Sequence, residues 1–267
     1  MILRRVIAHF RKQEWTAILI DLVIVIAGVF IANQVTVWKD EAALSKRKAA
    51  AIERLHGESE AIVKYVGDRV ARLEENNSLA AEAMRRLVAD DWRGADAAKA
   101  AQGFDSVGLA PAAAPPRSAY DELIGAGLFA EIGDAELRQA VSDYYAYLAF
   151  LQAQIDYVRQ GIIAESAQRR FQGLKRIYDP AAFRSNRIEY DVEALSADAG
   201  FIDYAIVMNE AQLAQQQWWS LLLVKAKAMC AEISRFDGRP CAPKEEERGD
   251  EMFGAAAPAA NEQAKRP

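Results

Sequence analysis

The chain has 267 residues and a formal net charge of −5, so nucleic acid is not an expected partner. Alanine is abundant while glycine and proline are few, a composition that favours helices throughout. His9 and His56 are the only histidines. Zinc sites and catalytic triads that require histidine in a pocket are therefore not expected. We expect no enzyme, no cofactor and no bound metal.

Residues 16–38 are long and apolar enough to cross a lipid bilayer, which needs about 20 residues. The Ile, Leu, Val and Phe side chains of this stretch contribute about −6 kcal/mol to insertion, against at most about +3 kcal/mol for Asp21. A cleaved signal peptide would have a shorter apolar core of about 7–15 residues, followed by a small-x-small cleavage site. The sequence therefore predicts an uncleaved transmembrane helix with the bilayer as its partner.

The segment before this helix, residues 1–15, alternates apolar and basic residues at helical spacing. It predicts a basic amphipathic arm on an anionic membrane surface, although a simple topogenic charge cluster is the alternative. The positive-inside rule does not decide the orientation, because both flanks of the helix are basic. The arm favours a cytoplasmic N-terminus.

One face of the predicted transmembrane helix carries Asp21, Gly28 and Ala32. Gly28 and Ala32 form a small-xxx-small pair, which is typical of close helix contacts in bilayers. This face predicts contact with a second copy of the chain, giving a homodimer, or with another membrane protein. The alternative is that Asp21 only reaches back to the lipid headgroups.

Residues 39 to about 90 form the first predicted helix after the membrane. A heptad-like stripe runs along it and is flanked by charged residues. The stripe comprises Ile52, Leu55, Ser59, Ile62, Val66, Val70, Leu73, Asn77, Ala80, Met84 and Leu87. It predicts either a bundle helix packed within its own chain or a dimeric coiled coil in which Asn77 sets the register.

The rest of the chain alternates breaks and helices. Glycine and proline mark a linker at 91–117, with a short helix near 95–102. A short helix starts at Ser118, which resembles a capping box with Asp121, and ends near Gly125 to Gly127. Asp134 is the expected N-cap of a long helix that continues to Tyr178. A connection with a helical turn near 192–195 follows, and the last long helix runs from about 199 to 236.

The two later helices have regular apolar stripes of their own. The first stripe is Leu137, Val141, Tyr144, Leu148, Leu151, Ile155, Val158 and Ile162. The second is Val207, Ala211, Ala214, Trp218, Leu222, Ala226, Met229 and Ile233. Strand-like alternation is not evident, so we predict an all-α fold in which the transmembrane helix precedes an antiparallel bundle of three long helices and one short helix. The bundle domain covers residues 39–236, and residues 237–267 form a disordered tail.

Two segments together resemble a bacterial family of uncharacterised single-pass inner-membrane proteins, a domain of unknown function. The first segment has a basic start, Gln13–Glu14–Trp15 before the membrane helix and a small-residue core. The second carries Tyr120, Leu123, Gly127, Ile132, Leu137, Arg138, Tyr144 and Tyr145. Thr36, Val37 and Lys39 depart from the family pattern. The resemblance implies location and architecture, without an activity.

The second of these segments, from Tyr120 to Tyr145, can also be interpreted from its residues alone. Packing explains most of it, because the aromatic and aliphatic positions share helix faces. The functional alternative is a pocket for a small anionic ligand, lined by Tyr120, Arg138, Tyr144 and Tyr145.

Cys230 and Cys241 are candidates for a disulfide bond. Cys230 lies near the end of the last helix, and Cys241 follows a break at Asp237, Gly238 and Pro240. A turn there brings the chain back along the helix, and disulfides persist in the periplasm. The alternative is that Cys230 is a small core residue and that Cys241 is free.

These observations predict a non-enzymatic scaffold or interaction protein of the bacterial inner membrane, with its helical domain in the periplasm. A ligand-sensing bundle is the alternative. With about 15 residues before the membrane helix, such a sensor would have to signal through a membrane partner.

Overall fold

The computed structural model describes residues 15–94, 97–108, 110–168, 171–180 and 186–243 of the chain. They are mostly helical, as predicted. The chain divides into two compact units, Met1–Ile52 and Glu53–Pro267. Helix α2 (Trp15–Ala89) begins in the first unit and ends in the second. The predicted basic arm and most of the predicted tail lie outside the described residues.

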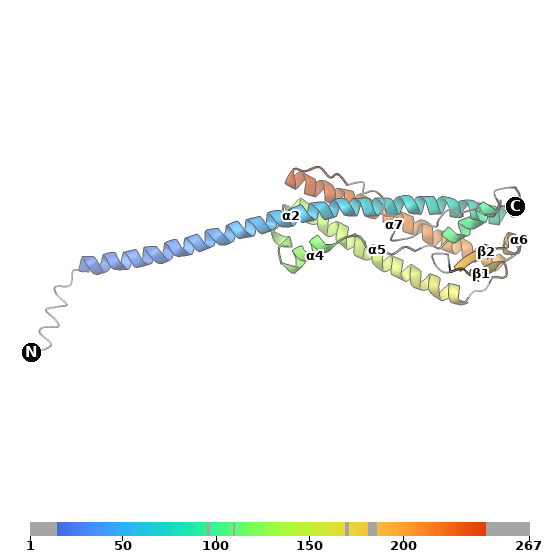
Figure 1. The fold of residues 1–267 in the computed structure, drawn as a ribbon, viewed down its shortest axis with the longest axis horizontal. Helices are drawn as coiled ribbons and strands as arrows, with labels where there is room; N and C mark the ends of the chain where they lie inside the picture. Colours follow the sequence, from blue (N-terminus) through green and yellow to red (C-terminus); the bar gives the residue numbers. More distant parts are fainter. Residues whose placement is uncertain (1–14, 95–96, 109, 169–170, 181–185, 244–267) are drawn as a thin grey trace, which may run out of the picture. The chain divides into compact units, whose positions relative to one another are not determined.

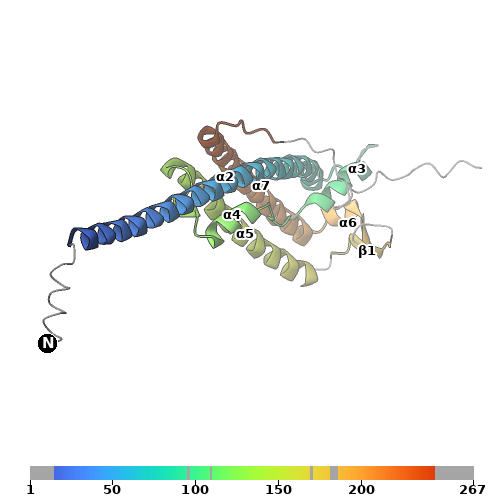
Figure 2. The same ribbon diagram turned by 60° about the vertical axis from the view of Figure 1, so that its left-hand side comes forward.

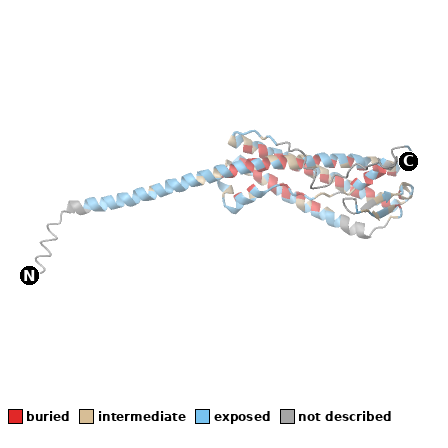
Figure 3. Ribbon diagram, viewed as in Figure 1, coloured by how far each residue is buried: buried red, intermediate tan, exposed pale blue. Residues whose placement is uncertain are grey.

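The described part of the first unit is helix α2 up to residue 52. Most of its described apolar side chains are exposed, including those of Val25, Phe30 and Trp38. Figure 3 accordingly colours most of this part of the helix as exposed. An 18-residue window of this helix has a mean hydropathy of 2.1, and none of that window is buried inside the protein. The helix is therefore long and apolar enough to cross a membrane, as the sequence predicts.

In the second unit, the C-terminal part of α2 buries the predicted stripe. Every member of that stripe from Leu55 to Leu87 is buried within the chain itself. The polar members Ser59 and Asn77 are buried with the others. The stripe thus belongs to the core of its own chain, which is the first of the two predicted arrangements.

Helices α5 (Ala135–Gln168) and α7 (Ala199–Asp237) lie side by side (Figures 1 and 2). The predicted α5 stripe is buried from Leu137 to Ile155. Val158 is half-buried, and the side chain of Ile162 lies outside the described set. Asp134 accepts a hydrogen bond from the Leu137 N–H at 2.9 Å, so it caps α5 as predicted.

The predicted stripe of α7 is correct only in its second half. Leu222, Ala226, Met229 and Ile233 are buried, but Val207 is 46% exposed. The buried positions of the first half are one residue later: Met208, Gln212, Gln215 and Trp219. Two glutamines thus occupy the core, where the sequence analysis predicted the alanines one residue earlier. Gln212 is stable there because Asn77 and the backbone of Gly108 supply its hydrogen bonds.

The short elements outnumber the single short helix of the predicted bundle. They are α3 (Ala97–Ala101), η1 (Gln102–Ser106), α4 (Ser118–Gly125), η2 (Phe129–Glu131) and α6 (Val192–Ser196). Helix α4 ends where predicted, and Gly127 adopts a positive φ of 67° that favours glycine. Helices α3 and α6 lie at the two places where the sequence indicated a short helix or turn.

A β-hairpin replaces the end of the predicted helix that was to reach Tyr178. Helix α5 ends at Gln168, and strand β1 (Leu174–Tyr178) pairs antiparallel with β2 (Asn186–Tyr190). The physical reason lies at Gly173, whose carbonyl accepts from the Asp191 N–H at 2.8 Å. A Cβ at Gly173 would lie 2.6 Å from Leu195 Cγ, so only glycine fits this close approach. Strands of five residues are too short for their alternation to stand out in the sequence.

Described residues of the predicted linker pack against the long helices of the second unit. We call residues 110–117 the strap. Gln152 of α5 donates to the Ala113 carbonyl at 2.8 Å, and the Ala114 N–H donates to Tyr65 Oη of α2 at 3.2 Å. Just before the strap, the Gly108 N–H donates to Gln212 of α7. The segment therefore makes contacts with three long helices.

Candidate functional site

A buried carboxylate on α2, that of Glu58, connects α2 with α4 and α5. It accepts hydrogen bonds from the backbone N–H groups of Ala119 (2.7 Å) and Tyr120 (3.2 Å). It also accepts from Ser118 Oγ at 3.1 Å and from Tyr145 Oη at 2.9 Å. A negative charge at the N-terminus of a helix is favourable, because unpaired N–H groups point towards it. Glu58 therefore caps α4 from another helix.

This arrangement corrects the predicted capping box. The residue before α4 is Arg117, and its side chain makes no capping hydrogen bond. Asp121 does not bond back to the backbone, because it forms an ion pair with Arg117 at 2.7 Å. Glu58 is one of the charged residues that flank the predicted stripe of α2, yet it is only 8% exposed. Its position next to the apolar stripe, one residue before Ser59, is the signal that was available.

Three of the four predicted pocket residues meet at Glu58. The rings of Tyr120 and Tyr145 are stacked with centroids 3.7 Å apart, and Tyr144 meets Tyr145 edge-on at 4.9 Å. Arg138 is elsewhere and donates to the carbonyls of Ile132 and Gly133, at 2.9 Å each, in the loop before α5. The tyrosines are thus packed against one another, while Arg138 fixes a loop.

Burial controls the chemistry of these tyrosines. It raises the pKa of Tyr144 and of Tyr145 well above the usual value, and the nearby negative charge of Glu58 adds to the effect. Both phenols therefore stay neutral at physiological pH. Tyr145 acts as a hydrogen-bond donor to Glu58, and neither phenol is poised as a base or nucleophile.

A second polar cluster lies around Tyr65, whose hydroxyl contacts the strap. The Arg69 guanidinium carbon is 5.9 Å from the centroid of Tyr65 and 5.8 Å from that of Trp219. Three buried donor atoms in this part of the unit have no hydrogen-bond partner among the described residues. They are Arg69 Nε, Tyr144 Oη and Trp219 Nε1. Unsatisfied buried donors are costly, so this cluster suits a small acceptor group or water.

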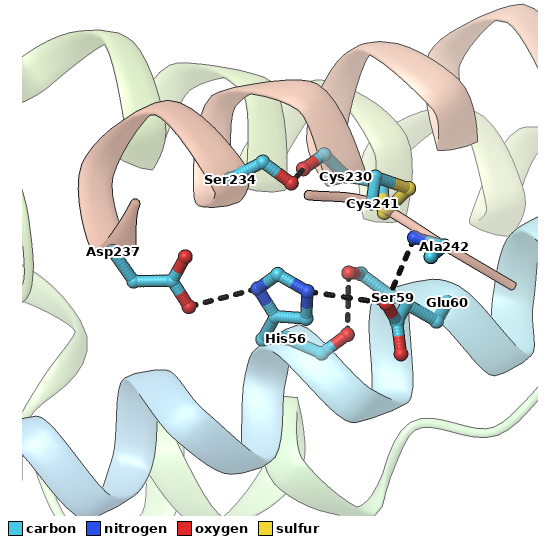
Figure 4. The surroundings of a disulfide bond; sticks show 8 residues. All are labelled: His56, Ser59, Glu60, Cys230, Ser234, Asp237, Cys241 and Ala242. Atoms are coloured by element: carbon cyan, nitrogen blue, oxygen red, sulfur yellow. Dashed lines mark hydrogen bonds and ion pairs between the residues drawn. A yellow bond between two sulfur atoms is a disulfide. The ribbon is translucent and has the colours of Figure 1, made fainter. Parts of the chain in front are cut away.

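A third polar cluster joins α2 to the end of α7. His56 is 4% exposed and lies between two carboxylates, with Nδ1 2.8 Å from Asp237 Oδ2 and Nε2 3.2 Å from Glu60 Oε1 (Figure 4). Asp237 is half-buried, and burial opposes its ionisation. The hydrogen bonds from Arg239 and His56 outweigh burial and lower the pKa of Asp237. The sequence analysis did not predict this cluster, because its members come from segments that are far apart in the chain.

The His56 cluster does not form a hydrolytic triad. The hydroxyl nearest in sequence, Ser59 Oγ, donates to the His56 carbonyl at 2.7 Å and not to its ring. Both ring nitrogens are bonded to carboxylates, which leaves none to activate a nucleophile. The cluster therefore fastens two helices together.

Cys230 and Cys241 form a disulfide bond beside this cluster (Figure 4), with their Cα atoms 5.8 Å apart. Gly238 ends α7 with a φ of +75°, and its N–H donates to the Ser234 carbonyl, so the chain turns back. The Ala242 N–H then donates to Glu60 at 2.9 Å. Residues 238–243, predicted as the start of a disordered tail, thus belong to the folded unit.

The predicted membrane contact residues Asp21, Gly28 and Ala32 all lie in the first unit, and all are exposed. A Cβ built on Gly28 would meet nothing within 4 Å. This face is therefore open to lipid or to a partner helix.

A groove of about 690 Å³ lies between α5 and α7. Its lining combines small apolar residues with charged ones: Ala135, Glu136, Gln139, Ala140, Asp143, Val224, Lys225, Ala228 and Glu232. The sequence analysis did not find it, because its residues come from two helix segments that are about 90 positions apart in the sequence.

Within the part of the chain that the structure describes, no three His, Cys, Asp or Glu side chains gather in a way that could hold a metal ion. No known family model, curated protein or solved structure matches the chain.

Proposed function

We propose that the chain is a membrane-anchored, non-enzymatic scaffold or interaction module of the bacterial envelope. The observation that carries the proposal is how the polar side chains of the helical unit are used. Glu58 and His56, the best candidates for chemistry, are buried and bonded to neighbouring helices. An open feature of the described residues is a groove between two helices. Buried, paired groups stabilise the unit, while the groove is available to another molecule.

The proposed location is the bacterial inner membrane, with a cytoplasmic N-terminus and the helical unit in the periplasm. The exposed apolar part of α2 supports the membrane anchor. The disulfide Cys230–Cys241 supports an oxidising compartment, since such bonds are rare in the cytosol. The resemblance to a family of single-pass inner-membrane proteins supports the same location.

Reporter fusions at Asp250 test the orientation. We expect an alkaline phosphatase fusion to be active there and a cytoplasmic fluorescent reporter to be dark. The reverse pattern would overturn the periplasmic location.

Purification after crosslinking tests the scaffold role. The full chain, crosslinked in intact membranes, is expected to carry a protein partner in constant proportion, with or without added small molecules. A chain that is recovered alone from crosslinked membranes would contradict the proposal.

The second candidate function is a ligand-sensing bundle that acts through a membrane partner. The unpartnered donors of Arg69, Tyr144 and Trp219 favour it, because a ligand with acceptor oxygens would satisfy them. Native mass spectrometry of the purified chain tests this role. A bound small molecule that is lost in Trp219→Phe, but retained in the exposed control Tyr178→Phe, supports sensing, and a ligand-free spectrum contradicts it.

A further inference from the structure

We propose that the groove between α5 and α7 binds an amphipathic helix of a partner protein, with an apolar stripe flanked by lysine or arginine. This inference rests on the proposed function and names the chemistry of the partner. It is carried by the position of the groove, by its small lining residues and by an excess of carboxylates along its rim.

The groove occupies a side of the α5–α7 pair that the core does not use. On α5, Glu136, Ala140 and Asp143 line the groove. Their neighbours Leu137 and Tyr144 are fully buried on the core side. The same division holds on α7, where Val224, Ala228 and Glu232 line the groove while Leu222, Ala226 and Met229 are buried in the core. The two helices, packed side by side, thus leave a groove into which a third helix can pack.

The size of the lining residues suits a helix. Ala135, Ala140 and Ala228 let another backbone approach closely, and Val224 is 62% exposed beside them. Close approach through small residues allows the interaxial distances of about 8–10 Å that are usual between helices.

An aromatic surface continues from the groove along the same two helices. Phe150 lies between Tyr147 and Trp218, with ring centroids at 5.5 and 6.3 Å. From Ala135 to Phe150, α5 extends about 22 Å, which matches about four turns of a guest helix. Aromatic side chains of this kind are enriched where proteins bind one another.

The charge along the rim of the groove determines which kind of partner helix can bind. Glu136, Asp143 and Glu232 face a single lining cation, Lys225, whose ammonium lies 5.7 Å from the centroid of the Tyr147 ring. Arg235 pairs with Glu232, while Asp143 accepts from neutral Gln139. The excess carboxylates on the α5 side attract lysine or arginine and repel acidic helices.

The same charge argues against two other occupants. A second copy of the chain would bring a second acidic rim to the first, and like charges that face one another oppose association. Anionic lipid headgroups would be repelled for the same reason. A partner helix with basic flanks fits both the apolar floor and the acidic rim.

Binding of a designed probe peptide to the full chain in neutral detergent tests the inference. The probe is a labelled helix of about 20 residues, with leucine in the apolar stripe and lysine on both flanks. The matched probe carries glutamate in place of lysine. By fluorescence anisotropy we expect the lysine probe to bind at least about tenfold more tightly than the glutamate probe, with the difference shrinking at high salt.

Variants locate the binding. Ala228→Trp fills the groove and is expected to abolish binding of the lysine probe. Glu136→Lys is expected to weaken it, while Glu74→Lys, on the exposed face of α2, leaves it unchanged. Circular dichroism verifies that each variant is folded, and Glu136→Lys, at an exposed position, provides the test if Ala228→Trp fails to fold. Equal binding of the two probes, or binding that survives Ala228→Trp in the folded chain, would overturn the inference.

Failure of the groove as the binding site can be distinguished from failure of the proposed scaffold function. If Ala228→Trp still crosslinks to the same membrane partner as the natural chain, the groove is not the docking site, but the scaffold role stands. If the natural chain has no partner, the scaffold role itself fails.

Discussion

At the scale of single residues, buried and half-buried carboxylates organise the helical unit. Glu58 satisfies two backbone N–H groups at the start of α4 and the phenol of Tyr145. Glu60 accepts from the backbone of Ala242 and contacts His56. Each carboxylate replaces local hydrogen bonds with contacts between segments far apart in the chain. The arrangement of the helices therefore depends on a few charged groups.

Replacing Glu58 tests this dependence. Glu58→Gln introduces an amide NH₂ that faces donors, and it removes the charge at the α4 N-terminus. Hydrogen bonds to charged groups contribute about 1.5–3 kcal/mol each, and we expect the free energy of unfolding to fall by about 2–3 kcal/mol. Urea denaturation of the chain in detergent measures the change. The exposed control Glu74→Gln should stay within about 0.5 kcal/mol of the natural chain. Equal stabilities of the two variants would contradict the role of Glu58.

The raised pKa of Tyr145 predicts a loss of stability at alkaline pH. The fold favours the neutral phenol, so its contribution is complete below the unfolded pKa of about 10 and decreases as the pH rises above it. We expect the free energy of unfolding to fall less steeply above about pH 10 in Tyr145→Phe than in the natural chain. Tyr178→Phe is the matched control, because Tyr178 is 77% exposed. Identical slopes for all three chains would refute the prediction.

At the scale of elements, polar contacts set how the helices pair. Asn77 of α2 accepts from Gln212 Nε2 at 2.6 Å and donates to Gln216 Oε1, both on α7. Gln212 also accepts from the Gly108 N–H before the strap. Apolar contacts alone allow two helices to pack in more than one register, whereas the hydrogen bonds of a buried amide network are all formed in one register only. This layer fixes α2, α7 and the backbone at Gly108 in one alignment.

Removing the amide of Asn77 distinguishes this packing from an interchain coiled coil. Asn77→Ala leaves Gln212 and Gln216 without their partner, and we expect a loss of about 1–3 kcal/mol in the free energy of unfolding. The mass measured by light scattering in detergent should not change. A change of oligomeric state in Asn77→Ala would show that Asn77 also acts between chains.

The disulfide holds the last described segment against α7. Cys241→Ala opens the short loop that it closes, and we expect the free energy of unfolding to fall by about 2–3 kcal/mol. Reduction should destabilise the natural chain by a similar amount and leave Cys241→Ala unchanged. Mass spectrometry of protein alkylated in intact cells provides the direct measurement. Two alkylated thiols in the natural chain would refute the bond.

At the scale of the whole molecule, the chain combines an exposed apolar helix with a folded helical unit. The helical unit contains its own core, clusters and disulfide. Many of its buried polar groups bind one another, while the α5–α7 groove and the apolar part of α2 are open. Both surfaces are available to other molecules.

If the apolar part of α2 spans the membrane, it is expected to self-associate through the face that carries Asp21, Gly28 and Ala32. Gly28→Leu places a large side chain where another helix would approach, and it should weaken the signal in a membrane dimerisation reporter. Phe30→Leu, on the opposite face, is the matched control and should keep the signal. A parent helix without any signal, or equal signals for both variants, would leave only an anchor.

The sequence by itself determined the helical nature of the chain, the apolar helix and the buried stripe from Leu55 to Leu87. Composition and a long apolar run reveal the first two features, and the stripe follows from periodicity, because its members lie three or four positions apart. The cap of α5 by Asp134 was also predictable, since the acceptor and the N–H lie three residues apart.

Tertiary structure decided whatever depends on a distant partner. Gln212 and Gln215 of α7, together with Glu58 and His56 of α2, are buried because other helices surround their side chains. Glu58, His56 and Gln212 find hydrogen-bond partners on those helices. The hairpin formed because Gly173 packs against Leu195 and bonds to Asp191. Whether burying a polar or glycine residue stabilises the fold depends on neighbours that lie far away in the sequence. The local sequence pattern therefore cannot reveal it.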